Sequence, residues 1–137
     1  MTFLVERLAE LRRHLDHLYE VRPRVATTAD LHRDLSLHND VLFSLLIVCQ
    51  LVIDIASELA VRRGVSFEDY VGAIRALAGD SRFPHAVVRD LERLPGFRNV
   101  VVHEYVALDL QRVIDALEGL DAVEQFVSIV RTIESSS

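Results

Sequence analysis

Leucine recurs at steps of three and four residues near the start of the chain. The repeat comprises Leu4, Leu8, Leu11, Leu15 and Leu18. Residues at this spacing share one face of an α-helix, which completes a turn every 3.6 residues. The pattern predicts a helix over residues 2–19. It ends before Pro23, because proline disfavours helical backbone in the residue that precedes it.

The following segment is more apolar than a one-sided helix requires. A second, long helix is predicted over residues 31–63, after several N-cap candidates in the run 27–30 (Thr-Thr-Ala-Asp). Residues 41–59 are apolar on most sides, which is typical of a helix that lies between others, either inside a bundle or across a dimer interface. Arg63 and Gly64 mark its end, because cations suit the negative helix terminus and glycine suits the left-handed cap.

The second half of the chain predicts shorter helices. Residues 66–69 (Ser-Phe-Glu-Asp) resemble a capping box that opens a third helix over residues 67–78. A fourth helix begins near Pro84, and we expect Pro95 and Gly96 to break or kink it, so that the chain is helical again over residues 97–105. A final helical region covers residues 109–133, where Gly119 is the candidate for a kink. Valines 100–102 would suit a strand but are isolated among helical patterns.

These patterns predict an all-α fold, an up-and-down bundle of about five helices. Residues 1–134 form a single domain, and residues 135–137, three serines, form a disordered tail. Half of the 137 residues are hydrophobic, which is enough for a core without disulfides. The single cysteine, Cys49, lies in an apolar run and is interpreted as a buried small hydrophobe.

The charge of the chain and its lack of targeting signals argue against a membrane protein, a secreted protein and a protein with a broad nucleic-acid-binding surface. The apolar stretch 41–53 is too short to span a bilayer, and the charged N-terminal segment lacks a signal peptide, so we expect a soluble cytoplasmic protein without a membrane partner. The net charge of −6 argues against binding nucleic acid through a broad basic surface. It is compatible with an enzyme that contacts RNA at a local basic cleft.

The segment 95–105 (Pro-Gly-Phe-Arg-Asn-Val-Val-Val-His-Glu-Tyr) contains the candidate chemistry. Histidine titrates near neutrality and acts as a general base or acid, whereas arginine keeps its charge and presents a planar fork to phosphate. Arg98 and His103 therefore suffice for metal-independent RNA cleavage, in which a 2′-hydroxyl attacks the neighbouring phosphorus. Five residues at about 100° each leave the two side chains roughly 140° apart on a regular helix. Either Arg98 reaches round, the helix ends near His103, or the site is composite.

The order Arg-Asn, three apolar residues, His, any residue, Tyr resembles the R-x4-H signature of HEPN-domain ribonucleases. The trailing tyrosine resembles the HepT-like toxins, which pair with a nucleotidyltransferase antitoxin of the MntA kind. Further matching features lie at residues 51–56, 63–64, 66–70 and 108–110, so the resemblance covers residues 31–126. It implies a homodimer whose two motifs meet in a shared cleft, a toxin that cuts RNA without a cofactor, and an antitoxin that adenylylates Tyr105.

Several residues have plainer interpretations. Asn99 orients Arg98 or His103 or binds RNA, or is a polar residue beside a helix start. Tyr105 without modification is an amphipathic residue at the core edge. Asp54 lies among apolar neighbours and needs a partner. It supports the active site or an interface, or else it lies on an exposed turn of the helix.

Two other functions remain open from the sequence. The first is a HEPN dimer that acts as a non-catalytic scaffold or regulator of a nucleotidyltransferase; the intact Arg98 and His103 pair favours the enzyme over it. The second is a small metal-binding bundle. His14 and His17, three residues apart, are its only candidate ligands and are better interpreted as solvated helix positions. The chain contains no Glu-x-x-His, and no metal or cofactor is expected.

Overall fold

In the computed structural model, which describes residues 2–136, every regular element is helical. The all-α prediction is confirmed. The elements are α1 (Thr2–Val21), η1 (Arg22–Arg24), α2 (Thr28–His32), α3 (Leu35–Arg62), α4 (Tyr70–Arg75), η2 (Ala76–Gly79), α5 (His85–Leu91), α6 (Arg93–His103), η3 (Tyr105–Ala107), α7 (Leu110–Glu118) and α8 (Leu120–Ser135).

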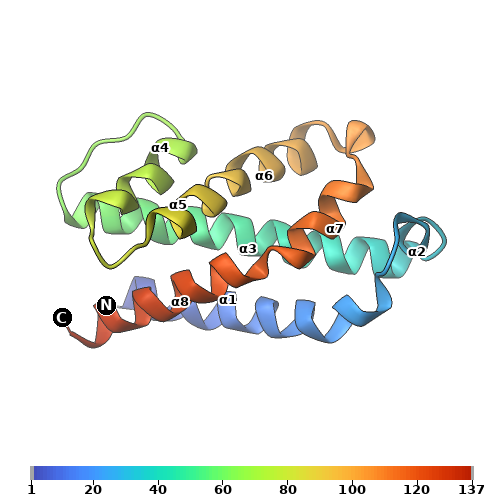
Figure 1. Ribbon diagram of the computed structural model, residues 1–137, viewed down its shortest axis with the longest axis horizontal. Helices are drawn as coiled ribbons and strands as arrows, with labels where there is room; N and C mark the ends of the chain where they lie inside the picture. Colours follow the sequence, from blue (N-terminus) through green and yellow to red (C-terminus); the bar gives the residue numbers. More distant parts are fainter. Residues whose placement is uncertain (1, 137) are drawn as a thin grey trace.

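Helix α3 runs through the length of the molecule, and α1, α2, α4, α6 and α7 pack against it (Figure 1). Helices α1 and α6 pack on different sides of α3, and both run antiparallel to it. Helix α8 packs against α1 and α5, which closes the bundle. The two chain termini lie at one end, whereas α2 and the turn that follows α6 lie at the other (Figure 1).

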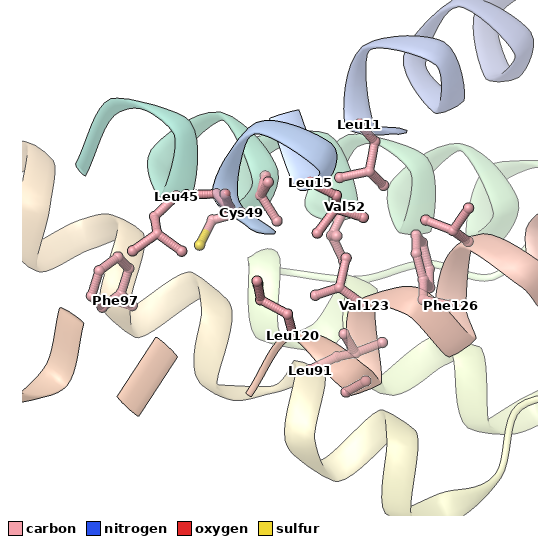
Figure 2. Packing of buried hydrophobic residues seen from close by; sticks show 14 of the residues in the cluster. Leu11, Leu15, Leu45, Cys49, Val52, Leu91, Phe97, Leu120, Val123 and Phe126 are labelled. Atoms are coloured by element: carbon pink, nitrogen blue, oxygen red, sulfur yellow. The ribbon is translucent and has the colours of Figure 1, made fainter. Parts of the chain in front are cut away.

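The core gathers apolar side chains from all of the long helices. Figure 2 shows it with Leu11, Leu15, Leu45, Cys49, Val52, Leu91, Phe97, Leu120, Val123 and Phe126. Phe126 is fully buried and lies beside Phe83, with 6.0 Å between the ring centres. Cys49 is buried as the sequence predicts, and burial raises the pKa of its thiol to about 12. The thiol is therefore protonated and behaves as a small apolar side chain.

Helix α3 is long and apolar enough to cross a membrane by length and composition alone. In the bundle, however, 56% of its most apolar window is buried against the other helices. Its inner positions, such as Val52 and Ile53, are fully buried. The apolarity of α3 is thus accounted for by its central place among α1, α4 and α6.

The start of the long helix differs from the prediction. Residues 28–32 form the separate helix α2, and α3 begins only at Leu35. The Asp30 carboxylate accepts the N–H groups of Thr27 and Ala26, which lowers its pKa. The Asp34 side chain accepts the Leu37 N–H, at 3.1 Å, and so caps α3. Two caps within a few residues produce two helices where the apolar pattern predicted one.

The third helix begins three residues later than predicted. Asp69, not Ser66, is the N-cap of α4, and its carboxylate accepts the Gly72 N–H at 2.7 Å. The predicted capping box at residues 66–69 is therefore wrong. The box contains a second acceptor, Asp69, and that carboxylate caps the helix actually formed.

The break predicted between the fourth helix and the motif helix is present, but it lies at Glu92 and not at Pro95 and Gly96. Helix α5 ends at Leu91, and α6 begins at Arg93 and continues through both residues to His103. Pro95 lies in the first turn of α6, where a backbone N–H has no partner within the helix, so proline removes no hydrogen bond there. The chain turns at Glu92 instead.

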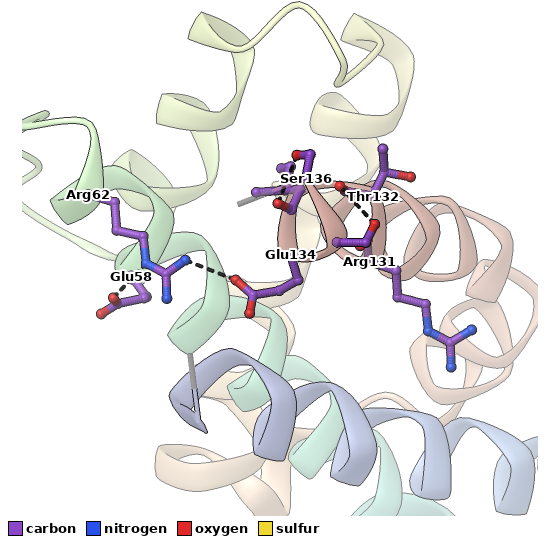
Figure 3. A network of polar contacts seen from close by, with 8 residues as sticks. Glu58, Arg62, Arg131, Thr132, Glu134 and Ser136 are labelled. Atoms are coloured by element: carbon purple, nitrogen blue, oxygen red, sulfur yellow. Dashed lines mark hydrogen bonds and ion pairs between the residues drawn. The ribbon is translucent and has the colours of Figure 1, made fainter.

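The C-terminal region follows the sequence more closely. Gly119 separates α7 from α8, as its position predicts. Helix α8 is fixed to the end of α3 by Arg62, which donates to Glu134 and Glu58 at 3.0 Å each (Figure 3). The tail was predicted to start at residue 135, but Ser135 is the last residue of α8 and Ser136 its cap. Ser137 lies outside the described residues.

Candidate active site

Arg98 projects from the middle of α6 toward α3 and is half-buried. Its Nε donates to Gln50 Oε1 at 3.0 Å, and its Nη1 donates to Asn99 Oδ1 at 3.1 Å. The guanidinium carbon lies 5.6 Å from the centre of the Tyr70 ring. Within residues 2–136, Arg98 forms no ion pair with a carboxylate. The guanidinium is thus oriented by neutral amides and keeps its charge for an anion.

Gln50 is a site residue that was not predicted from the sequence. Its Nε2 donates to Asp54 Oδ1 at 2.9 Å, which fixes the amide so that its oxygen faces Arg98. Asp54 therefore has the partner that its position demands, and it supports Arg98 through Gln50. The signal was available in the sequence: the two polar residues lie four apart in an apolar helix, and so share one face.

His103 is the last residue of α6 and is exposed. The helix ends there because Glu104 leaves the helical region, with φ −135° and ψ 39°. The sequence left three arrangements open: Arg98 reaches round the helix, the helix ends near His103, or the site is composite. In the structure the helix ends at His103. Within residues 2–136, His103 makes no hydrogen bond or ion pair, with Arg98 or with any other residue. Within one copy of the chain, no hydrogen bond therefore joins the two motif side chains.

Tyr105 opens η3, directly after the end of α6, and is 49% exposed. Its hydroxyl lies 3.4 Å from His38 Nδ1, and the two rings meet edge to face with 6.0 Å between centres. His38 is not among the site residues predicted from the sequence. Nothing in its local pattern marks it, since the contact joins positions 67 residues apart.

The motif and its partners lie along one strip of the molecule. Helices α3 and α6 run in opposite directions, so Gln50 meets Arg98 while His38 meets Tyr105 (Figure 1). The twelve residues from His38 to Gln50 correspond to about 18 Å along α3. Beside Arg98, this strip opens into a cleft lined by Asp69, Tyr70, Val71, Pro95 and Asn99.

The histidines of α1 are structural. His14 Nδ1 lies 3.1 Å from Ser44 Oγ, and His17 Nε2 lies 2.8 Å from Asp40 Oδ1. Their interpretation as solvated positions is wrong, because both side chains join α1 to α3. Among the described residues 2–136, no three His, Cys, Asp or Glu side chains gather as a metal site.

Comparison with known proteins places these features in a family. A model of the family described as ribonuclease HepT-like matches residues 6–130. The chain belongs to the HepT-like ribonuclease family. The mRNA nuclease HepT of Shewanella oneidensis is 22% identical over 130 residues, which is 93% of this chain and 96% of that protein. The sequence-based prediction of a HepT-like ribonuclease is therefore confirmed.

Solved structures agree on the fold. A tri-AMPylated HEPN toxin of Shewanella oneidensis, solved in complex with the MNT antitoxin, superposes with a TM-score of 0.83 at 21% identity, over 96% of this chain and 98% of that one. A toxin–antitoxin structure with AMP-PNP gives a TM-score of 0.84 at 20% identity, over 96% and 99%. The HEPN-type bundle predicted for this chain is thus confirmed.

The hydrogen bond from Arg98 to Gln50 leads to a first prediction. Gln50→Ala removes the acceptor of a charged donor, a bond worth about 1.5–3 kcal/mol. We expect kcat/KM for RNA cleavage to fall about 10- to 100-fold because Arg98 loses its orientation, and the thermal midpoint to fall by several degrees because the same bond stabilises the fold. Gln111→Ala, which removes an exposed amide of α7 bound to Asp115, is the matched control. Equal activity of both variants would show that Arg98 needs no support from α3.

Proposed function

We propose that the chain is the toxin of a toxin–antitoxin pair, a metal-independent RNA endonuclease that acts on cellular RNA in the cytoplasm. The observation that carries the proposal is the state of Arg98, which is oriented by Gln50 and Asn99 and unpaired with any carboxylate in residues 2–136. A guanidinium held in this way is preorganised for the phosphoryl oxygens of RNA. Membership of a ribonuclease family supports the same activity.

Each motif residue has a distinct role in this proposal. His103 exchanges a proton with the 2′-hydroxyl or with the leaving 5′-oxygen, because an exposed imidazole is available to either. Arg98 stabilises the charge that develops on the phosphoryl oxygens. Asn99 orients Arg98 and contacts RNA at the adjacent cleft. Asp54 holds Gln50, and through it Arg98.

A homodimer completes the site. No hydrogen bond joins Arg98 and His103 within one chain, and a cleft shared by two chains supplies their proximity. Exposed apolar side chains beside the motif support this arrangement: Val102 is 44% exposed and Val106 99% exposed. A second copy that covers them brings two motifs together. It also concentrates arginine charge locally on a protein whose net charge is −6.

We expect the wild-type protein to have the mass of a dimer in light scattering. Val106→Asp places a charge in the proposed interface, so the dimer dissociates and RNA cleavage is lost. Val5→Asp introduces the same charge at a position of α1 that is 54% exposed, and it leaves both mass and activity unchanged. A wild-type protein that cleaves RNA as a monomer would contradict the composite site.

The nuclease itself is tested by cleavage in EDTA. We expect unmodified wild-type protein to cut RNA, and His103→Ala and Arg98→Ala each to lower the rate about 100-fold or more, as loss of an acid–base group or a charge-stabilising group does. His85→Ala and Arg89→Ala change exposed residues of α5 and keep wild-type activity. Equal cutting by the wild type and His103→Ala would remove His103 from the mechanism. A dimer that binds a nucleotidyltransferase and cuts no RNA would support the scaffold alternative.

A nucleotidyltransferase antitoxin is the proposed partner, and Tyr105 the residue it modifies. The solved relative is an AMPylated toxin in complex with an MNT antitoxin. Tyr105 is half exposed and two residues from His103, so an adenylate on its hydroxyl adds negative charge and bulk at the RNA site.

Intact-mass measurement after co-expression with an MNT-type antitoxin tests this modification. The wild type gains adenylate mass and loses RNA cleavage. Tyr105→Phe lacks the accepting oxygen, so it gains no adenylate at this position and resists inactivation. The control Tyr70→Phe changes a tyrosine of similar exposure, 40%, and is modified like the wild type. Inactivation of Tyr105→Phe by antitoxin and ATP would contradict the assignment.

A further inference from the structure

The Tyr105 hydroxyl has one hydrogen-bond partner among the described residues 2–136, the imidazole of His38. The hydroxyl oxygen and His38 Nδ1 are 3.4 Å apart, and the edge-to-face contact of the rings holds the two groups in this relation. A nucleophile with a basic side chain at hydrogen-bond distance is the arrangement that activates weak oxygen nucleophiles, and such distances are longer before the co-substrate binds.

The position of His38 follows from the break between α2 and α3. Asp34 caps α3 at Leu37, and the His38 N–H donates to the Asp34 carbonyl at 2.9 Å. His38 is therefore fixed within the first turn of a long helix, at the end of the bundle where η3 presents Tyr105 (Figure 1). A rigid helix thus carries the imidazole, whereas Tyr105 lies in a short turn.

We propose that His38 is the proton acceptor that activates Tyr105 for adenylyl transfer. This inference rests on the proposed modification of Tyr105. The phenolic oxygen attacks the α-phosphorus of a nucleoside triphosphate, and a new O–P bond forms. The bond between that phosphorus and the bridging oxygen breaks, and pyrophosphate leaves with the electron pair. The phenolic proton passes to His38 Nδ1.

Asn39 stabilises the product of this proton transfer. Its Oδ1 lies 3.2 Å from the same His38 Nδ1. While Nδ1 is unprotonated, it accepts from the Tyr105 hydroxyl. Once Nδ1 holds the proton, the imidazolium donates to the Asn39 oxygen. The nearby carboxylate of Asp40 is engaged by His17 on α1, so it does not compete for His38.

The proposal is testable on the chain alone, without an antitoxin. An aryl sulfonyl fluoride reacts with tyrosine when the phenolic oxygen attacks sulfur and fluoride leaves, so its rate reports the same activation. Peptide mass spectrometry then gives the labelling rates of Tyr105 and Tyr70 in one sample. Because the two side chains have similar exposure, 49% and 40%, Tyr70 serves as the internal reference.

We expect Tyr105 to be labelled faster than Tyr70 in the wild type. His38→Ala lowers the Tyr105 rate about 100-fold, the scale of general base catalysis, and leaves the Tyr70 rate unchanged. His38→Asn keeps an acceptor oxygen near the place of Nδ1 but takes up no proton, so it is as slow as His38→Ala. Added imidazole restores the rate of His38→Ala. His32→Ala removes an exposed histidine of α2 and behaves like the wild type.

Several results would overturn the inference. Wild-type labelling of Tyr105 in His38→Ala would exclude a role for His38, and a full rate in His38→Asn would reduce that role to hydrogen bonding. Circular dichroism and the thermal midpoint establish that the variants remain folded. RNA cleavage by unmodified His38→Ala tests the nuclease proposal separately from the role of His38. We expect this variant to cleave RNA like the wild type. If Tyr105 labelling turns out not to depend on His38, the nuclease proposal therefore still stands.

Discussion

The structure depends on the need to cover α3. A 28-residue helix that is apolar on most sides is stable in water only between other helices, and α1 and α6 supply most of that cover. The helix that carries the R-x4-H motif is therefore held in place by the largest apolar contact available to it. Gln50 and Asp54 lie where the cover of α3 ends, so they are close enough to α6 to orient Arg98 and open enough for a substrate to reach it.

The chain uses arginine in two different ways. Arg12 pairs with Glu124 and Arg62 pairs with Glu134, and these ion pairs fix α8 to α1 and α3. In both pairs a carboxylate neutralises the arginine charge. Arg98 is instead held by the amides of Gln50 and Asn99. The Asp54 carboxylate bonds Gln50 and not Arg98 itself. Since neutral partners orient a guanidinium without neutralising it, this arrangement suits a group that must bind phosphate.

The sequence predicted the features marked by clear periodicity, proline or glycine, and it missed both competing local caps and contacts that form only on folding. The leucine repeat of α1, the start of α5 after Pro84 and the boundary at Gly119 all follow from residues within a few positions. The start of α3 was missed because the apolar periodicity continues across Asp34. The Asp34 side chain caps a new helix there by accepting the Leu37 N–H. Gln50 had a readable signal in its spacing from Asp54, whereas the contact between His38 and Tyr105 has none, since folding alone brings them together.

One rigid helix supports both ends of the candidate site. Gln50 of α3 orients Arg98, and His38, about 18 Å earlier on the same helix, contacts Tyr105. A substituent on the Tyr105 hydroxyl displaces its contact with His38 and leaves the bonds of Arg98 in place. In the proposed modification, an adenylate on Tyr105 would inactivate the toxin by adding charge and bulk beside His103, without unfolding the bundle.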